Sequence, residues 1–269
     1  MKALKKYLKN RKGAIHFILE KPRATFSTST FHKLRVEIKK LNALFDLINF
    51  CSKDFKRKKN FKPFKEIFRQ AGKVRELQLE DIMLHKYHSV TSLNDYRNNL
   101  KNLGIQEQEM FFSMINKHFI ALLKNKYELI IPLLSAINKK EANRYMETKI
   151  NSIQKLLDKR SLKTQDFHEI RKQIKLFGFN RKSLSLKDKI NPISNQKLLG
   201  NLLGKWHDNH VIINHLYKTM DTGKLNSKES SQIKQLKTKI SSRRDLFFTK
   251  IKLAIPLSEF IKKRKHQHQ

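Results

Sequence analysis

The stretch FHKLRVEIKKLNALFDLI, residues 31–48, separates apolar and charged residues in a helical pattern. When it is projected as an α-helix at about 100° per residue, its apolar residues fall on one face. These residues are Leu34, Ile38, Leu41, Leu44, Phe45 and Ile48. His32, Arg35 and Lys39 fall together on the opposite face, and Lys40 lies to one side of them. The pattern predicts an amphipathic helix with one face in a core and a row of cations on the other.

A related stretch, FHEIRKQIKL, occupies residues 167–176. It repeats the histidine, the arginine and the lysine at the same spacing, as His168, Arg171 and Lys175. Its apolar residues Ile170 and Ile174, together with the next residue Phe177, again lie opposite the cations. A row of cations about one helical turn apart suits a linear anion whose charges recur at short intervals.

The second stretch also differs from the first. Asp166 and Glu169 resemble a capping box, which predicts that this helix starts just before Phe167. Leu176 stands at the position that matches Lys40, so one basic residue is missing from the second copy. The first copy is therefore the stronger candidate for an anion site.

A second pair of related segments follows at nearly the same separation. AGKVRELQLEDIML, residues 71–84, resembles LGKWHDNHVIINHL, residues 203–216. Two motifs in the same order indicate a duplication. We expect two related halves, residues 1–138 and 139–262, followed by a basic tail at 263–269.

The composition favours an all-helical protein. Glycine (7) and proline (5) are scarce in 269 residues, and strand-like runs bounded by turn residues are few. Breaks between helices are expected at several places. They are Pro22 with the serine and threonine run at 27–30, Asn60–Pro63 as a helix start, Pro132, the polar joint 138–141, and loops at 183–194 and 219–227.

Charge is the strongest compositional feature. The 59 Lys and Arg residues outnumber the 23 Asp and Glu residues, which gives a formal net charge of +36. Such an excess favours a polyanionic partner, whether nucleic acid, an anionic membrane surface or polyphosphate, although a generally lysine-rich composition is an alternative. The single cysteine, Cys51, excludes internal disulfides, and no apolar run is long enough to span a membrane. We expect a cytoplasmic protein.

The two motif pairs resemble those of the CHAD family, the conserved histidine α-helical domain. That family's helix carries His, then Arg at +3 and basic residues at +7 and +8, and a later helix carries a Gly-basic-x-Arg-Asp element. The resemblance implies two pseudo-symmetric four-helix halves around a basic surface or channel that binds inorganic polyphosphate.

The resemblance also implies the binding residues. In the first half they are His32, Arg35, Lys39 and Lys40, together with Lys73 and Arg75 of the later helix. In the second half they are His168, Arg171, Lys172 and Lys175, together with Lys205 and His207. His207 stands where the family has Arg, and Glu76 stands where it has Asp.

Three alternatives fit part of the sequence. A nucleic-acid-binding helical protein fits the charge, but the sequence lacks a helix-turn-helix spacing and exposed aromatic platforms. A phosphate-cleaving enzyme needs metal-binding carboxylates that the sequence does not supply. His207–Asp208 resembles a metal-hydrolase dipeptide, but further ligands are missing. The sequence therefore predicts a binding protein without catalytic residues, metal or cofactor, and it leaves the oligomeric state open.

Overall fold

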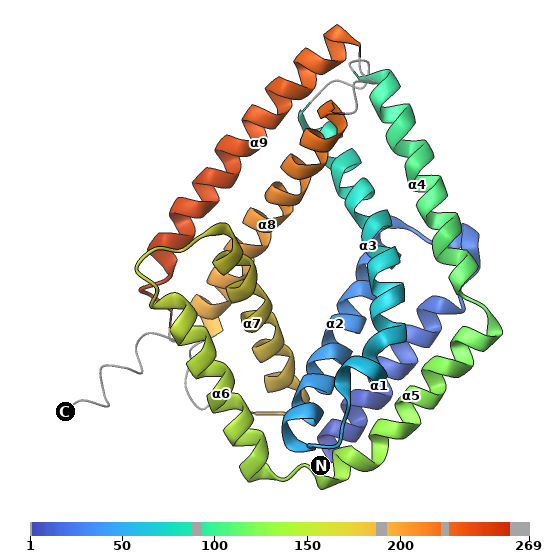
Figure 1. The fold of residues 1–269 in the computed structure, drawn as a ribbon, viewed down its shortest axis with the longest axis vertical. Coiled ribbons are helices and arrows are strands. Elements are labelled where there is room, and N and C mark those ends of the chain that lie inside the picture. The colour runs from blue at the N-terminus through green and yellow to red at the C-terminus, as the bar shows by residue number, and fades with distance from the viewer. Residues whose placement is uncertain (1, 88–92, 187–192, 222–225, 259–269) are drawn as a thin grey trace. The chain divides into compact units, whose positions relative to one another are not determined.

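A computed structural model describes residues 2–87, 93–186, 193–221 and 226–258 of the chain. Within these ranges the chain forms nine α-helices, one short 3-10 helix and no β-strand, so the all-α prediction is confirmed (Figure 1). The α-helices are α1 (Lys2–Leu19), α2 (Thr28–Cys51), α3 (Arg57–Tyr87), α4 (Asn94–Met114), α5 (Lys117–Ala136), α6 (Lys139–Leu157), α7 (Thr164–Ser183), α8 (Ile193–Asp221) and α9 (Ser227–Ala254). The 3-10 helix η1 spans Arg23–Thr25.

The contacts within the chain divide it into two compact units. Unit 1 comprises Met1–Lys73, Glu107–Leu156 and Lys172–Lys189, and unit 2 comprises Val74–Gln106, Leu157–Arg171 and Ile190–Gln269. Helices α3, α4 and α7 therefore contribute residues to both units, as does α6 through its last residue, Leu157. The expected halves 1–138 and 139–262 are inferred from repeated sequence motifs, whereas these units are defined by contacts. The duplication therefore stays a prediction. The predicted tail 263–269 lies outside the described residues.

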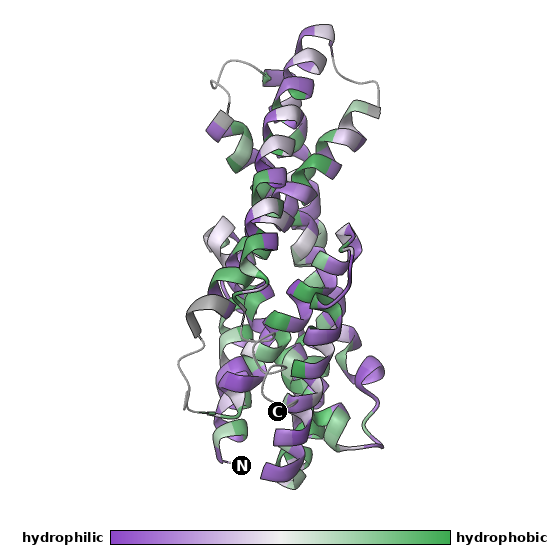
Figure 2. Ribbon diagram, turned by 90° about the vertical axis from the view of Figure 1, so that its left-hand side faces the viewer, coloured by the Kyte–Doolittle hydropathy of each residue, from purple (hydrophilic) through white to green (hydrophobic). Residues whose placement is uncertain are grey.

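The core of unit 1 is rich in phenylalanine. Phe45 of α2 makes edge-on contacts with Phe55, Phe61 and Phe64, and Phe64 contacts Tyr127 of α5 in the same way. These ring pairs fasten α2, the first part of α3 and α5 together, because edge-to-face aromatic contacts add to the gain from apolar burial. Most helices carry both apolar and polar residues along their length, as expected of helices with one buried face (Figure 2).

One core cluster of unit 2 is mainly aliphatic. It is built by the last part of α3, the first part of α4, the last part of α8 and the first part of α9. Its buried residues are Leu84, Leu93, Tyr96, Leu100, Ile212, Ile213, Leu216, Ile233, Leu236 and Ile240. Glu229 of α9 adds a polar contact, because its carboxylate accepts hydrogen bonds from the backbone N–H groups of Asp95 (3.0 Å) and Tyr96 (3.3 Å). The acidic side chain thereby caps the N-terminus of α4.

The serine and threonine run at 27–30 starts α2. Ser27 and Thr30 form a capping box, in which each side chain accepts a 3.3 Å hydrogen bond from the other residue's backbone N–H. The preceding helix α1 has already ended at Leu19, before Pro22.

Two prolines lie inside helices rather than at their ends. The prediction that Asn60–Pro63 opens a helix is wrong, because α3 begins at Arg57. The Arg57 side chain donates a 3.0 Å hydrogen bond to Asn42 of α2, and this tether fixes the start of α3 upstream of the proline. The expected break at Pro132 is also wrong, because α5 continues through it to Ala136.

The start of α7 also differs from the prediction. The helix begins at Thr164, so Asp166 lies in its first turn. The Asp166 carboxylate accepts a 2.8 Å hydrogen bond from the backbone N–H of Lys163 and pairs with Lys159. These contacts lower the pKa of Asp166, with the Lys159 hydrogen bond as the largest cause. The capping interaction thus exists, but one turn earlier than the sequence pattern indicates.

Helix α8 extends at both ends into the loops predicted at 183–194 and 219–227. Helix α8 begins at Ile193 and continues through Thr219 to Asp221. Residues 187–192 and 222–225, which include Pro192 and Gly223, lie outside the described residues.

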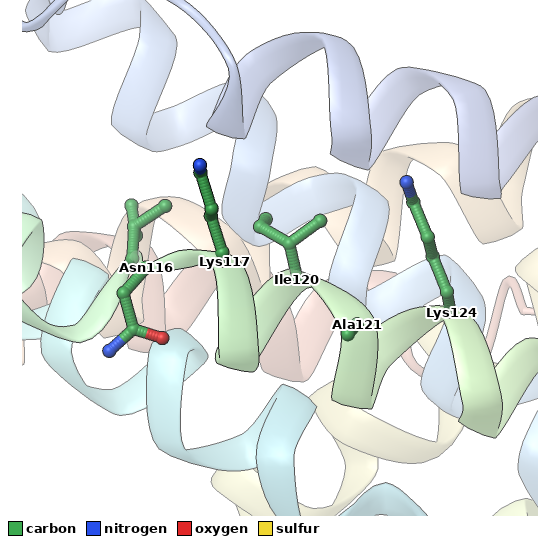
Figure 3. Close-up of a pocket in the computed structure, with 6 residues that line it drawn as sticks. Asn116, Lys117, Ile120, Ala121 and Lys124 are labelled. Atoms are coloured by element: carbon green, nitrogen blue, oxygen red, sulfur yellow. The ribbon is translucent and has the colours of Figure 1, made fainter.

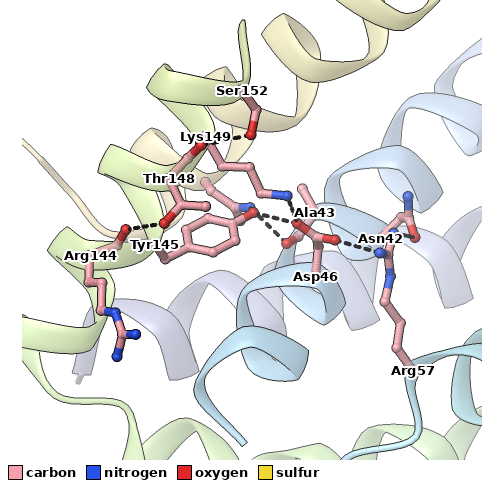
Figure 4. A network of polar contacts seen from close by, with 10 residues as sticks. Asn42, Ala43, Asp46, Arg57, Arg144, Tyr145, Thr148, Lys149 and Ser152 are labelled. Carbon is pink, nitrogen blue, oxygen red and sulfur yellow. Dashed lines mark hydrogen bonds and ion pairs between the residues drawn. The ribbon is translucent and has the colours of Figure 1, made fainter. Parts of the chain in front are cut away.

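A polar cluster around Asp46 connects four segments of unit 1 (Figure 4). The Asp46 carboxylate of α2 pairs with Arg57 of α3 and with Lys149 of α6, at 2.7 Å, and accepts a 2.8 Å hydrogen bond from the Tyr145 hydroxyl. Asn180 of α7 is fully buried and donates to the Ala43 carbonyl oxygen (2.8 Å) and to the Tyr145 hydroxyl (2.6 Å). This cluster holds the C-terminal part of α7 and helix α6 against α2.

Candidate anion-binding site

The two faces predicted for residues 31–48 are confirmed in α2. All six apolar residues of the predicted face are buried. On the other face His32 is exposed, and Arg35 and Lys39 are half-buried. Helical spacing alone places these three side chains in one row.

Arg35 is held in a defined position within unit 1. Its Nη1 donates a 2.8 Å hydrogen bond to the Phe68 carbonyl oxygen of α3, and its guanidinium carbon lies 4.2 Å from the centroid of the Phe68 ring. The ammonium of Lys39 lies 5.6 Å from the same centroid. Phe68 therefore gathers two of the predicted cations, because the face of an aromatic ring attracts positive charge.

Gly72, one turn after Phe68, leaves room for the Arg35 guanidinium. A Cβ atom at this position would lie 2.1 Å from Arg35 Nη1, far inside contact distance. The equivalent glycine of the second copy, Gly204, is different: a Cβ atom there meets nothing within 4 Å. The glycine of the Gly-Lys motif therefore makes room for an arginine side chain in the first copy and not in the second.

Two other predicted cations of unit 1 form ion pairs. Lys40 lies 2.6 Å from Glu37, and the same carboxylate lies 2.6 Å from Arg11 of α1. Lys73 lies 3.3 Å from Glu107 of α4. Lys40 and Lys73 therefore offer less unopposed positive charge to an anion than residues outside such pairs.

In unit 2 the predicted histidines form a cluster. His168 of α7 and His207 of α8 approach each other with 3.1 Å between their Nδ1 atoms. The His168 ring also contacts Trp206 and His210, and His210 stacks on Trp206 with ring planes 7° apart. Trp206 is buried, as a core aromatic is expected to be, so the cluster is anchored to the core of unit 2.

Arg75 and Arg171 lie in the same electrostatic neighbourhood. Burial lowers the pKa of both guanidinium groups, and the carboxylate of Asp208 acts against that effect in each case. The Nε atom of Arg171 is buried without a hydrogen-bond partner among the described residues. Unit 2 therefore brings Arg75, Arg171, His168 and His207 near one another, with one carboxylate among them.

The remaining predicted residues are exposed. Lys172 and Lys175 project from the part of α7 that belongs to unit 1. Lys205 of α8 is exposed, and its ammonium lies 5.8 Å from the centroid of the Phe247 ring of α9.

Sequence reasoning missed the aromatic partners of these cations. Phe68 precedes the Gly-Lys motif by one helical turn, and this spacing could have placed it beside Arg35. No comparable signal identifies the Asp46 cluster, whose members are scattered over four helices. Among the described residues, no three His, Cys, Asp or Glu side chains are grouped as metal ligands.

An open depression runs along α5, away from the predicted residues (Figure 3). It has a volume of about 580 Å³, and its lining includes Lys117, Ile120 and Lys124. These three side chains project from one face of α5. None of the predicted anion-binding residues lines it.

Among the described helices, none has an apolar stretch of the length that a membrane span requires.

Comparison with solved structures identifies the fold. The chain is similar to the CHAD domain from the plant Ricinus communis, with a TM-score of 0.76 and 10% sequence identity over 94% of this chain and 90% of that one. It is also similar to PptA from Streptomyces chartreusis, with a TM-score of 0.65 and 11% identity over 94% and 98%. No protein-family model and no curated protein matches the sequence. The chain therefore has the fold of a CHAD domain, as its motifs predict.

Proposed function

We propose that this protein binds inorganic polyphosphate without cleaving it, through cations of α2, α3, α7 and α8. The observation that carries the proposal is the fixed position of Arg35. Its guanidinium donates to the Phe68 carbonyl oxygen and lies over the Phe68 ring. A guanidinium presents its N–H donors in a rigid fork that matches the oxygens of a phosphate. An arginine that is held in place before binding loses less side-chain entropy on contact with an anion.

Two further cations of α2 extend this site along a linear ligand. His32 and Lys39 lie one turn to either side of Arg35 on α2, and one helical turn advances about 5.4 Å. In unit 2, Arg75, Arg171, His168 and His207 would contribute a second set of donors. The net charge of +36 supplies long-range attraction. The CHAD-domain fold is a further support, since the sequence resemblance connects that family with polyphosphate.

A partner of this kind has a thermodynamic consequence. Each phosphate that is neutralised releases counterions, so the logarithm of affinity should fall linearly with the logarithm of salt concentration. If single-stranded nucleic acid is a fair guide, the slope is about −0.7 per contact. In this proposal the protein acts in the cytoplasm, with polyphosphate granules as one place of action.

The test is a titration with long-chain polyphosphate and with single-stranded RNA at equal phosphate concentration. We expect polyphosphate to bind more tightly, and Arg35→Gln to weaken that binding by about tenfold, the effect of one charge-assisted contact. Arg144→Gln is the matched control, because Arg144 is 72% exposed on α6 and lies outside the predicted site.

Two outcomes would contradict the proposal. Equal affinity for RNA would favour a general nucleic-acid-binding protein. An equal loss in the Arg35 and Arg144 variants would show that overall charge, rather than this site, binds the ligand. The absence of catalysis is tested separately, by incubating polyphosphate with the protein and magnesium or manganese and following chain length on a gel.

A further inference from the structure

A small pocket in unit 2 lies among α3, α4 and α8. Its volume is about 230 Å³, and it contains none of the predicted anion-binding residues. Leu77 of α3 and Leu100 and Leu103 of α4 give it an apolar lining. Pockets that bind small molecules are typically apolar with a few placed polar groups, and this one is smaller than the usual drug-sized site of about 300–1,000 Å³.

The most buried polar group of the pocket is Glu80, whose exposed fraction is 2%. One of its carboxylate oxygens accepts a hydrogen bond from the Tyr96 hydroxyl, and the other lies 3.2 Å from Nδ1 of His215. Nε2 of His215 lies 3.4 Å from Glu76. Hydrogen bonds to the two glutamates raise the pKa of His215 to about 9, so it is a cation at neutral pH. Both oxygens of Glu80 are therefore occupied, and its charge is compensated.

The exposed polar groups of the pocket have no such partners. Lys218 of α8 and Asn99 of α4 line it, and both are exposed. Neither forms an ion pair or a side-chain hydrogen bond with another described residue. An ammonium and an amide N–H group are thus available as donors, while Glu80, the one carboxylate among the described lining residues, is already engaged. This arrangement disfavours a cationic ligand and favours a ligand with a negative head group.

We propose that this pocket binds a small organic anion with a compact apolar body. The anionic group contacts Lys218 and Asn99, and the body lies against the three leucines. None of the residues proposed to bind polyphosphate lines this pocket. A linear inorganic polyanion also has no apolar part to place against Leu77, Leu100 and Leu103.

The test uses two probes of similar size, the anionic 4-fluorobenzoate and the neutral 4-fluorobenzyl alcohol, with binding followed by fluorine NMR of the probe. We expect saturable binding of the benzoate and at least tenfold weaker binding of the neutral alcohol. Lys218→Gln should reduce benzoate affinity by about tenfold and leave the alcohol unaffected. Leu103→Trp should weaken both probes, because the larger side chain fills the pocket. Leu103 is 41% exposed, so the fold should tolerate this change.

Lys234→Gln is the matched control. Lys234 is exposed on α9 and does not line the pocket, and its replacement removes the same charge. The proposal is overturned if the alcohol binds as tightly as the benzoate, if Lys218→Gln and Lys234→Gln weaken the benzoate equally, or if no probe binds saturably. Polyphosphate titration of the Lys218 variant should match the unaltered protein, which keeps this test independent of the first proposal.

Discussion

The guanidinium of Arg35 rests against the backbone of Gly72, on a site that only a residue without a side chain leaves open. A Cβ atom on Gly72 would lie 2.1 Å from Nη1 and 3.1 Å from the guanidinium carbon of Arg35. The obstructed group is the end of a flexible side chain, which can move. A side chain at position 72 therefore displaces the arginine more than it damages the fold.

Gly72→Ala should lower polyphosphate affinity by about tenfold while leaving the protein folded. The methyl group forces Arg35 away from the Phe68 carbonyl, and the loss of one positioned arginine contact accounts for a factor of this size. Isothermal titration calorimetry with long-chain polyphosphate measures the affinity, and circular dichroism checks that the helices persist.

The second copy of the motif provides the control for this change. A Cβ atom on Gly204 meets nothing within 4 Å, so Gly204→Ala should not alter binding. It should raise the free energy of unfolding by about 1 kcal/mol, the difference in helix propensity between alanine and glycine. If both variants bind polyphosphate as the unaltered protein does, Gly72 does not position Arg35 for binding.

Glu37 partly neutralises the first-half site, because its carboxylate pairs with both Lys40 and Arg11 at 2.6 Å. Glu37→Gln should therefore strengthen polyphosphate binding several-fold, since Lys40 is released for the ligand and local repulsion of phosphate is removed. A fluorescence titration at low salt measures the change best, because screening is weakest there.

Glu147→Gln is the matched control for the Glu37 variant. Glu147 is exposed on α6, forms no ion pair with a described residue, and carries the same charge. It should strengthen binding less than Glu37→Gln does. Equal effects of the two variants would mean that polyphosphate responds to net charge alone and that Lys40 has no particular role.

Asn180 fixes α7 to α2 inside unit 1, through its two hydrogen bonds to the Ala43 carbonyl oxygen and the Tyr145 hydroxyl. Asn180→Ala removes both donors from a fully buried position and leaves a small void. We expect a loss of about 2–3 kcal/mol in the free energy of unfolding. Urea denaturation followed by circular dichroism measures it. Asn151→Ala, at an exposed position of α6, should change stability by less than about 0.5 kcal/mol.

The amphipathic faces of α2 and α7 could be predicted from sequence because burial follows the helical period. The positions of Leu34, Ile38, Ile170 and Ile174 depend only on their spacing, and all four are buried. The start of α3 depends on more than local sequence. Pro63 is a strong local start signal, but the contacts of Arg57 with α2 begin the helix earlier.

The contacts that orient the candidate cations could be predicted only in part. The row of His32, Arg35 and Lys39 follows from spacing, whereas the ion pair of Lys73 with Glu107 joins residues on different helices. Glu80 and His215 each lie in one of the two related Gly-Lys segments, but nothing in those segments indicates that these two residues pair. Such pairs depend on how the helices pack together, and no periodic pattern in a single sequence indicates them.

His215 should make the stability of unit 2 depend on pH. Its pKa is raised to about 9 in the folded protein, mainly by hydrogen bonds to Glu76 and Glu80, against an ordinary value of 6.5. A raised pKa stabilises the fold fully below about pH 6.5, and this contribution is lost as the pH rises through 9. A shift of this size corresponds to at most about 3 kcal/mol.

His215→Gln should therefore destabilise the protein strongly at pH 6 and much less at pH 10. Trp206, the single tryptophan, is buried in unit 2, so its fluorescence during urea unfolding measures the difference. His118→Gln, at an exposed position of α5 in unit 1, should leave both values unchanged. A difference between the unaltered protein and His215→Gln that stays constant from pH 6 to pH 10 would show that the charge of His215 does not stabilise the fold.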